Sequence, residues 1–377
     1  MKKTDFDELK YACWLDTIQG FGRVTKYKLL NCTGNAKETY DLNDEMIRNI
    51  IGDKGLVYWK KHKEENFPDK ILENIYNKEI KYTYSLAEDF PEKLKNISDP
   101  PFGLFYLGSL PENDIPAVAI IGSRDYSEYG RCMADFFGSR FAQRKINVIS
   151  GMASGIDGIG QRSAIKAGGK SYGILGCGVD VIYPRGNREL YYKLIENGGV
   201  ISEYTPGMPP KASLFPMRNR IISALSDAVL VVEAKEKSGT LITVDMALEQ
   251  GRDVYAVPGR CTDNLSMGCN RLLRQGAGIA LTPEDIITDM GWKIDTSAGK
   301  AICKKNKLPE LTDIAAVILD IVTEYPKTQD DIVSAFRQRQ DGYKDISIPF
   351  VCQGLLELEL KGVCKRVSGL YQRIMEY

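Results

Sequence analysis

The sequence has few of the groups on which the commonest enzyme classes depend. Its 377 residues include a single histidine, His62, which lies among lysines. A single histidine argues against Ser-His-Asp or Cys-His catalysis and against a histidine-rich metal site. We expect His62 to be a solvated helix residue. The nine cysteines never form CxxC, and their odd number, scattered among apolar runs, favours reduced thiols and no metal site.

Long apolar runs and the common nucleotide fingerprints are also missing. No run approaches the roughly 18 apolar residues that a membrane-spanning helix needs, and the N-terminal residues are polar rather than signal-like. Neither GxGxxG nor GxxxxGK[ST] occurs, which argues against a dinucleotide cofactor and against a P-loop nucleotide triphosphatase. We expect a cytoplasmic protein with no membrane insertion and no cofactor.

Excess charge of either sign is absent as well. The chain has 50 Lys and Arg against 50 Asp and Glu, for a formal net charge of zero. A neutral chain has no overall attraction to nucleic acids, anionic membranes or acidic substrates. Any site for a polyanion must therefore be a local patch.

The chain length allows two or three domains at roughly 100–200 residues each. Residues 1–90 have the apolar spacing of short helices, and their connection at 18–22 is similar to a helix-hairpin-helix turn, in which glycines let amides approach a phosphate. Plain helix packing is the favoured interpretation of that turn. Residues 91–115 are rich in proline and are predicted to be a linker.

The C-terminal region is predicted to be a second, smaller module. Residues 296–307 are lysine-rich and polar, as expected of a linker. Residues 308–377 show three helical patterns followed by strand, turn and strand, the outline of a winged-helix-like domain. Such modules contact either DNA or protein, and the local charge does not separate the two alternatives.

Residues 116–295 alternate short apolar runs with amphipathic stretches. The predicted strands are 117–121, 147–150, 171–175, 200–203, 228–233, 253–257 and 278–281. The predicted helices are 127–144, 156–167, 188–197, 241–250 and 270–275. This alternation predicts an α/β fold, a Rossmann-like, doubly wound and mainly parallel sheet. Such sheets bind ligands at the carboxyl ends of their strands.

Glycines and hydroxyls follow several of these strands. Gly122, Ser123 and Arg124 follow the first strand, Ser150 and Gly151 begin the loop after the second, and Gly155 stands before the next helix. Such loops could hold phosphate through backbone amides at helix starts, with hydroxyls and Arg124 as further donors. Each loop alone is weak evidence, because strand-to-helix turns need glycine for their geometry in any case.

A stronger signal lies in residues 204–226, which contain no acidic residue. Lys211, Arg218 and Arg220 place positive charge beside Phe215 there. Cations next to an aromatic platform suit single-stranded nucleic acid, whose unpaired bases expose a face for stacking. The alternative, which the residues alone favour, is that Phe215 is core, that the arginines pair with acids such as Glu233, and that Asn219 caps the following helix.

The motifs in their order resemble the DprA/Smf family of bacterial DNA processing proteins. The segments that carry the resemblance are 119–124 (AIIGSR), 149–157 (ISGMASGID), 178–184 (GVDVIYP), 201–204 (ISEY), 215–222 (FPMRNRII), 231–234 (VVEA), 238–243 (SGTLIT) and 256–259 (AVPG). The resemblance implies a dimeric protein that binds single-stranded DNA and helps to load the recombinase RecA during natural transformation.

The resemblance also implies site residues. Gly122, Ser123 and Arg124 would form part of a pocket for the DNA backbone. The strand-binding surface would carry Phe215, Arg218, Asn219 and Arg220, and Lys211 beside them. Two positions depart from the family's pattern: Ser154 stands where arginine is usual, and Gly160-Gln161 stand where Ala-His is usual.

An enzyme is the alternative from another class. Phosphoribohydrolases of the lysine-decarboxylase-like type share a Rossmann-like core, and Glu233 with Asp245 could in principle perform acid–base catalysis. Their Gly-Gly-x-Gly-Thr-x-x-Glu segment is not matched by residues 238–243, which have no glutamate three positions after the threonine. The chain also lacks the GxGxxG fingerprint of an NAD-dependent oxidoreductase. We expect a binding protein without catalytic residues.

Overall fold

The computed structural model describes residues 3–293, 311–323, 326–338, 348–367 and 369–374. They belong to two compact units, Met1–Thr296 and Ser297–Tyr377. The predicted linker 296–307 lies outside the described residues. No helix in the described ranges is both long enough and apolar enough to cross a bilayer.

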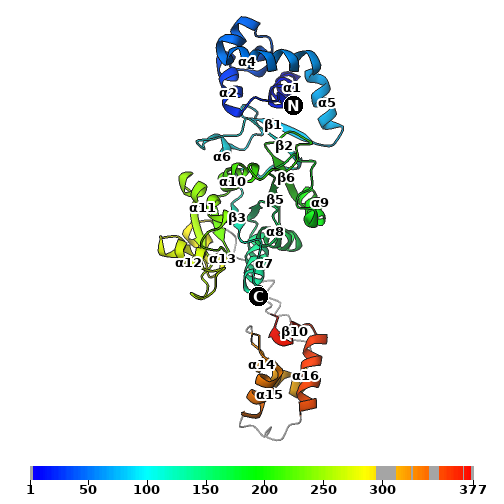
Figure 1. Cartoon of the computed structure of the whole chain (residues 1–377), viewed down its shortest axis with the longest axis vertical. Coiled ribbons are helices and arrows are strands. Elements are labelled where there is room, and N and C mark those ends of the chain that lie inside the picture. The colour runs from blue at the N-terminus through cyan, green and yellow to red at the C-terminus, as the bar shows by residue number, and fades with distance from the viewer. Residues whose placement is uncertain (1–2, 294–310, 324–325, 339–347, 368, 375–377) are drawn as a thin grey trace. The chain divides into compact units, whose positions relative to one another are not determined.

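Five helices open the first unit, as predicted for the N-terminal region. They are α1 (Lys3–Thr17), α2 (Arg23–Thr33), α3 (Ala36–Tyr40), α4 (Asp44–Glu65) and α5 (Pro68–Tyr76). In the turn between α1 and α2, Gly20 has a φ of 86° and packs against the ring of Tyr58. A side chain thus covers one face of the glycine turn that we compared with a phosphate-binding hairpin. Figure 1 shows these helices together beyond β1 and β2.

His62 differs from the solvated residue we expected. Its ring lies 5.1 Å from that of Trp14 and 3.2 Å from the hydroxyl of Thr17, measured from Nε2. Burial lowers the pKa of His62. The one histidine is therefore part of the packing of the N-terminal helices.

A nine-stranded sheet forms the centre of this unit, in the order β1-β2-β6-β5-β4-β3-β7-β8-β9. Its strands are β1 (Lys81–Tyr84), β2 (Gly103–Gly108), β3 (Ala117–Ile121), β4 (Asn147–Ser150), β5 (Ser171–Ile174), β6 (Gly198–Ser202), β7 (Ala228–Val231), β8 (Asp253–Ala256) and β9 (Gly278–Ile279). The strands from β3 to β9 pair in parallel. The predicted Rossmann-like, mainly parallel sheet is confirmed.

The predicted linker at 91–115 differs from the structure. Residues 103–108 form β2, which pairs antiparallel with both β1 and β6. The short helix α6 (Glu92–Lys95) also lies within this stretch. Pro100 and Pro101 lie before the first paired residue, Gly103, so their missing amide donors are outside the ladder. The sheet therefore begins before residue 90 and joins the N-terminal helices to the central fold.

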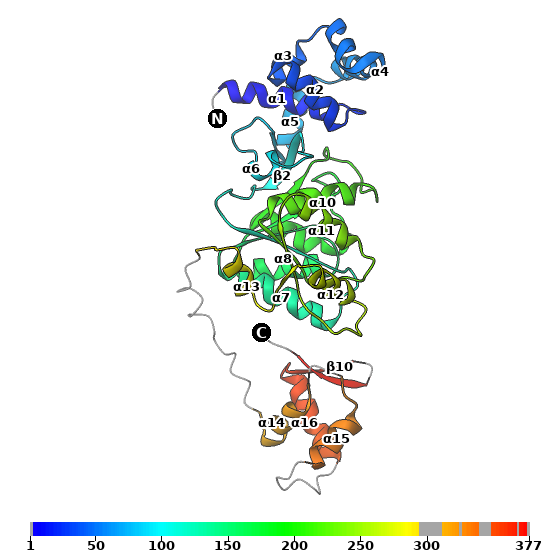
Figure 2. The same ribbon diagram turned by 90° about the vertical axis from the view of Figure 1, so that its left-hand side faces the viewer.

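Helices cover both faces of the sheet (Figure 2). They are α7 (Glu128–Gln143), α8 (Ile156–Lys166), α9 (Arg188–Glu196), α10 (Leu214–Leu225), α11 (Gly239–Glu249), α12 (Met267–Arg274) and α13 (Pro283–Asp289). Alternate residues of β3 point to opposite faces, as the twofold repeat of a strand requires. Val118 and Ile120 pack with α7 and α8, whereas Ala119 and Ile121 pack with α10 and α11.

The second unit has the element order that the sequence predicted. Helices α14 (Asp313–Ile321), α15 (Gln329–Gln338) and α16 (Ile348–Leu360) precede a hairpin of β10 (Cys364–Val367) and β11 (Leu370–Arg373). A separate apolar core contains Ile318, Phe336 and Leu355. The predicted three helices and hairpin are therefore confirmed.

Candidate nucleic-acid interface

A groove of about 640 Å³ lies where the strand order of the sheet reverses. From β3 the chain proceeds to β4, β5 and β6 on one side, and from β7 to β8 and β9 on the other. At such a switch point the loops after the two central strands diverge and leave a crevice. The groove is lined by the loops after β3, β4 and β7, by the first turns of α10, and by the start of α11. The sequence predicted a site at this edge of the sheet.

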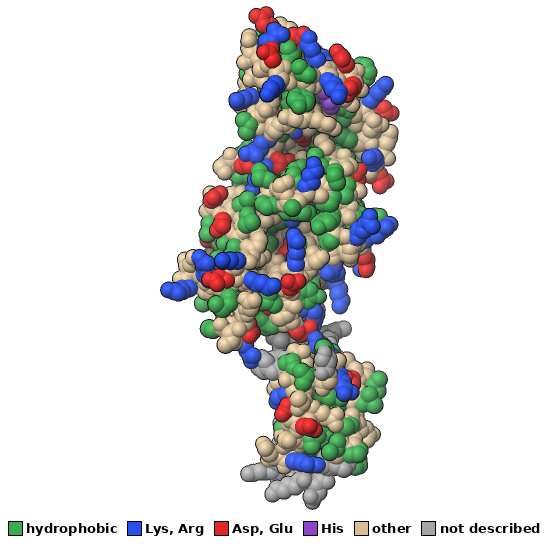
Figure 3. Space-filling model, in the orientation of Figure 1, with side chains coloured by type: hydrophobic (Ala, Val, Ile, Leu, Met, Phe, Trp, Pro, Cys, Tyr) green, Lys and Arg blue, Asp and Glu red, His purple; other side chains and the backbone are tan. Residues whose placement is uncertain are grey.

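Exposed cations border the groove. Arg124 follows β3 and is exposed, and Lys235 and Lys237 follow β7. Lys235 lies 3.3 Å from the carboxylate of Asp125, and Lys237 is exposed. Elsewhere the two signs of charge are interspersed on the face of the molecule that Figure 3 shows, in keeping with a net charge of zero. The positive charge is thus local, as the neutral composition requires.

Helix α10 begins at Leu214, earlier than the sequence suggested. Phe215, Arg218, Asn219 and Arg220 are therefore on its first two turns instead of in a preceding loop. Phe215, Arg218 and Asn219 line the groove. Asn219 is the sixth residue of the helix and does not cap it. Lys211 is exposed before the helix, beside Pro210 and Ala212 of the groove but not itself among the lining residues.

Phe215 is half-buried and stacks against Tyr183, with ring centroids 5.4 Å apart and an interplanar angle of 27°. Tyr183 is 40% exposed. The two rings, with Arg124 and Arg218, also line a smaller pocket of about 60 Å³ next to the groove. The arrangement offers an aromatic surface beside cations, the combination that single-stranded nucleic acids favour.

Arg218 lies inside the protein, under the groove. Its side chain is 5% exposed, and Nη1 donates to the carbonyl oxygen of Gly151 at 2.8 Å and to that of Ile174. Burial lowers the pKa of Arg218 to about 10, so the guanidinium remains cationic at neutral pH. Nη1 is thus committed to the ends of two strands, and this buried position differs from the surface cation that the resemblance implied.

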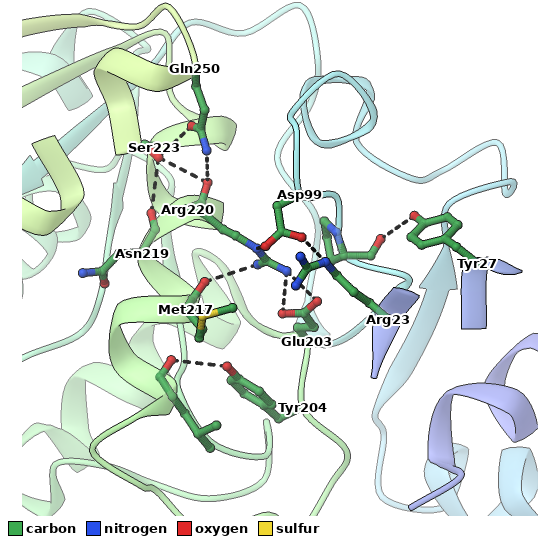
Figure 4. A network of polar contacts seen from close by, with 12 residues as sticks. Arg23, Tyr27, Asp99, Glu203, Tyr204, Met217, Asn219, Arg220, Ser223 and Gln250 are labelled. Atoms are coloured by element: carbon green, nitrogen blue, oxygen red, sulfur yellow. Dashed lines mark hydrogen bonds and ion pairs between the residues drawn. The ribbon is translucent and has the colours of Figure 1, made fainter. Parts of the chain in front are cut away.

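Arg220 points away from the groove and is 4% exposed. Figure 4 shows its guanidinium between Glu203 and Asp99. It donates to both oxygens of Glu203, at 2.7 and 2.8 Å, and from Nε to Asp99 at 3.1 Å. Arg23 of α2 pairs with the other oxygen of Asp99. Arg220 is therefore a structural ion pair, a correction to its predicted place on the strand-binding surface. The sequence raised acid pairing as the alternative, with other acids as partners.

The glycine loops are close together, but several of their amides are occupied. Gly122 and Gly151 donate their amides to the carboxylate of Asp157, at 3.3 and 3.2 Å. The amide of Ser123 donates to the carbonyl oxygen of Glu233 at 2.8 Å. These three donors cannot also hold a phosphate. At these positions the amides therefore do not form the predicted phosphate site. They connect the loops after β3 and β4 to Asp157 and Glu233, under Arg124.

Two further predicted residues also hold these loops together. Ser150 is buried and donates its hydroxyl to the carbonyl oxygen of Ile120 at 2.6 Å. Gly155 has a φ of 85°, and a side chain there would collide with the backbone of Ser123 and Arg124. Neither residue lines the groove. Both bring the loop after β4 against the loop after β3.

The positions that depart from the family's pattern have different surroundings. Ser154 is exposed and lines the smaller pocket. Gln161 is buried on α8, where Nε2 donates to the carbonyl oxygen of Tyr172 at 2.9 Å. The glutamine is thus a packing residue, whereas the serine leaves one rim of the pocket without charge.

Sequence reasoning did not single out Tyr183, Lys235 and Lys237 as site residues. Tyr183 belongs to one of the family motifs, GVDVIYP, but the motif does not show that its ring stacks on Phe215. The two lysines occur beside Glu236, so the composition of the segment hides their position at the groove. Their place after β7, the strand that pairs with β3, was the usable signal.

The two carboxylates considered for acid–base catalysis, Glu233 and Asp245, have different surroundings. Glu233 is 2% exposed and accepts hydrogen bonds from the amide of Ser127 at 2.9 Å and from its hydroxyl. Burial raises the pKa of Glu233, while the bonds from Ser127 oppose the rise. Asp245 is exposed on α11 and does not line the groove. Glu233 therefore holds the start of α7 and is not paired with Asp245.

Comparison with known proteins agrees with this geometry. Residues 81–291 match the family described as DNA recombination-mediator protein A. The DNA processing protein DprA of Bacillus subtilis (strain 168) is 40% identical over 278 residues, which cover 73% of this chain and 94% of that protein.

Two solved structures are similar to the chain. The crystal structure of DprA from Streptococcus pneumoniae has a TM-score of 0.66 and 31% sequence identity, over 74% of this chain and 97% of that one. A structure of DprA from Helicobacter pylori, described for its single-stranded DNA binding mode, has a TM-score of 0.51 and 29% identity, over 56% of this chain and 95% of that one.

Proposed function

The chain belongs to the DNA recombination-mediator protein A family, the DprA/Smf proteins, and from that premise we propose that it binds single-stranded DNA in the groove between the loops after β3 and β7. The observation that carries the proposal is the meeting of exposed cations with a stacked aromatic pair at the switch point of the sheet. Phosphates would lie against Arg124, Lys235 and Lys237, and a base against Tyr183 and Phe215.

This binding should tolerate any sequence. Aromatic faces stack on every base, and cations contact the backbone, which is the same at each nucleotide. A duplex hides its base faces, so the aromatic pair would contribute nothing to duplex binding. The protein should therefore prefer single strands over duplexes of the same length.

Binding, rather than catalysis, is the role that the carboxylates support. Asp157 and Glu233 are both buried and both occupied by backbone amides. A general base must reach the proton that it removes. Glu233 does not line the groove, and Asp157, which does, is only 7% exposed and accepts a backbone amide at each oxygen. A phosphoribohydrolase activity would appear as release of base from nucleoside monophosphates, which we expect to be absent.

The family premise extends the proposal to partners. We propose that the protein acts as a homodimer in the cytoplasm and helps to load RecA onto single strands during natural transformation. Two grooves in one dimer would raise the apparent affinity for a long strand through effective concentration. Sedimentation would test the dimer, and the rate of RecA filament formation on single strands, with and without the protein, would test loading.

The groove itself is tested by Arg124→Ala and Lys237→Ala. Affinity for a labelled oligothymidine of about 20 nucleotides is measured by fluorescence anisotropy over a series of salt concentrations. Three or four phosphate contacts predict a slope of log affinity against log salt near −2 to −3, and each variant should reduce its magnitude by about 0.7. Arg48→Ala, at an exposed site on α4, is the matched control. Unchanged affinity and slope in both groove variants would remove the groove from consideration.

A further inference from the structure

One buried carboxylate joins the loops that follow two strands. Asp157, in the first turn of α8, is 7% exposed and accepts the amides of Gly122 and Gly151. Gly122 comes directly after β3 and Gly151 directly after β4. Ionised carboxylates accept at two oxygens, so a single side chain fixes the distance between the two loops.

Arg218 makes the complementary connection from the other side. Its Nη1 donates to the carbonyl oxygen of Gly151, directly after β4, and to that of Ile174, the last residue of β5. Gly151 is thereby held by its amide to Asp157 and by its carbonyl to Arg218. A Cβ at Gly151 would lie 2.6 Å from the guanidinium, so this approach requires glycine.

The two charges compensate each other. Burial raises the pKa of Asp157, and the positive charge of Arg218 and the two amides oppose that rise. Two buried charges that are each hydrogen bonded are far less costly than either alone. Asp157 and Arg218 both border the groove, but they are only 7% and 5% exposed, and their hydrogen bonds are made inside the protein.

We propose that Asp157 and Arg218 are positioning residues, which set the groove's affinity for single-stranded DNA by holding Arg124 and Phe215 in place and do not contact DNA themselves. Arg124 stands two residues after Gly122, and Phe215 stands three before Arg218 on α10. The inference rests on the proposed function, because it explains how that groove is held.

Asp157→Asn gives the sharpest test, because the two explanations predict opposite signs. If the carboxylate of Asp157 acted only through its charge, loss of that negative charge would tighten DNA binding. If Asp157 positions the loops, binding weakens, since the asparagine offers one acceptor and turns an NH₂ donor toward the other amide. We expect affinity to fall about fivefold or more with an unchanged salt slope, since no phosphate contact is lost.

Gly151→Ala tests the same connection without a change of charge. The added methyl should displace the guanidinium of Arg218 and weaken binding, again with an unchanged slope. Arg218→Lys should not keep wild-type affinity, because lysine has no counterpart of Nε, which donates to Asn219, and its compact ammonium cannot take the place of the planar guanidinium between the two carbonyls. A lysine that binds DNA as well as the arginine would identify Arg218 as a phosphate contact and overturn the proposal.

Amide hydrogen exchange of the free protein supplies a readout that needs no DNA. In Asp157→Asn the amides of Gly122 and Gly151 should exchange faster, while those of β8 and α12 keep their wild-type rates. Wild-type rates at both glycines would overturn the positioning role. Absence of DNA binding by the wild-type protein would count against the proposed function, and the exchange rates would still decide this inference. Should Asp157→Asn not fold, Gly151→Ala decides, and affinity equal to wild type would refute the proposal.

Discussion

The ring of Tyr183 lies against that of Phe215, with centroids 5.4 Å apart and planes inclined by 27°. Phe215 comes from helix α10, whereas Tyr183 comes from the loop between β5 and α9. The pair thus joins two segments at the edge of the groove, and the outer ring is 40% exposed. A base that enters the groove can stack on Tyr183, with Phe215 as support.

Tyr183→Ala should therefore weaken binding of single-stranded DNA without changing its salt dependence. Stacking of one base on an aromatic side chain is worth about 1–3 kcal/mol, so affinity should fall about 5- to 150-fold. Tyr183→Phe should bind as the wild type does, because the ring is kept. Tyr192→Ala, at an exposed tyrosine of α9, is the control. Anisotropy titrations check this, and a loss of slope in Tyr183→Ala would contradict stacking.

Arg220→Met should affect stability and leave the salt slope unaltered. The substitution leaves Glu203 and Asp99 with one cation, Arg23, in place of two. Removing one partner of a buried ion pair costs about 3–5 kcal/mol. Unfolding by urea, followed by tryptophan fluorescence, measures the change, because Trp14, Trp59 and Trp292 all belong to the first unit. Arg274→Met, at an exposed site on α12, serves as the control.

A stable Arg220→Met protein with a reduced salt slope would restore Arg220 to the DNA-binding surface. This outcome is distinguishable from general destabilisation, because unfolding changes the active fraction of protein and leaves the slope of the folded fraction as it was. Binding is therefore measured at urea-free conditions, where the unfolding curve shows the variant to be folded.

Sequence patterns located the strands of the central sheet well because burial and twofold alternation act locally. The predicted strands 117–121 and 147–150 coincide with β3 and β4. These strands are buried on both faces, and buried strands are continuous apolar runs bounded by glycine. The edge of the sheet was harder: β2 is adjacent to two prolines, which favoured a linker over a strand.

The orientation of α10 could not be derived in the same way. Arg218 and Arg220 are two positions apart on a helix, so their side chains leave it in different directions. Both are buried, and each is held by partners from elsewhere in the chain: Asp99 is 121 positions away from Arg220. The acid-free segment therefore predicts a surface patch, although Arg220 pairs with the carboxylates of Asp99 and Glu203 and Arg218 donates to backbone carbonyls.

Glu357→Gln should make the second unit less stable at neutral pH but not in strong acid. Hydrogen bonds from Thr312 and Lys361 lower the pKa of Glu357 to about 2. A carboxylate with a lowered folded pKa contributes stability that is present above its ordinary value and is lost as the pH falls toward the folded value. The difference in melting temperature between wild type and variant should thus shrink from pH 4.5 to about pH 2. A constant difference over that window would contradict the assignment.

Removal of residues 297–377 should leave the affinity for single-stranded DNA unchanged. All residues that line the groove belong to the first unit. In the second unit, the exposed side chains of α16 include Leu356 and Leu360, which are 55% and 80% exposed, and apolar surface favours protein contact over contact with phosphates. The shortened chain should thus match the full chain in affinity and in salt slope by anisotropy. A slope smaller by about 0.7 or more would show that the second unit neutralises at least one phosphate, and its winged-helix-like hairpin would then belong to the DNA interface.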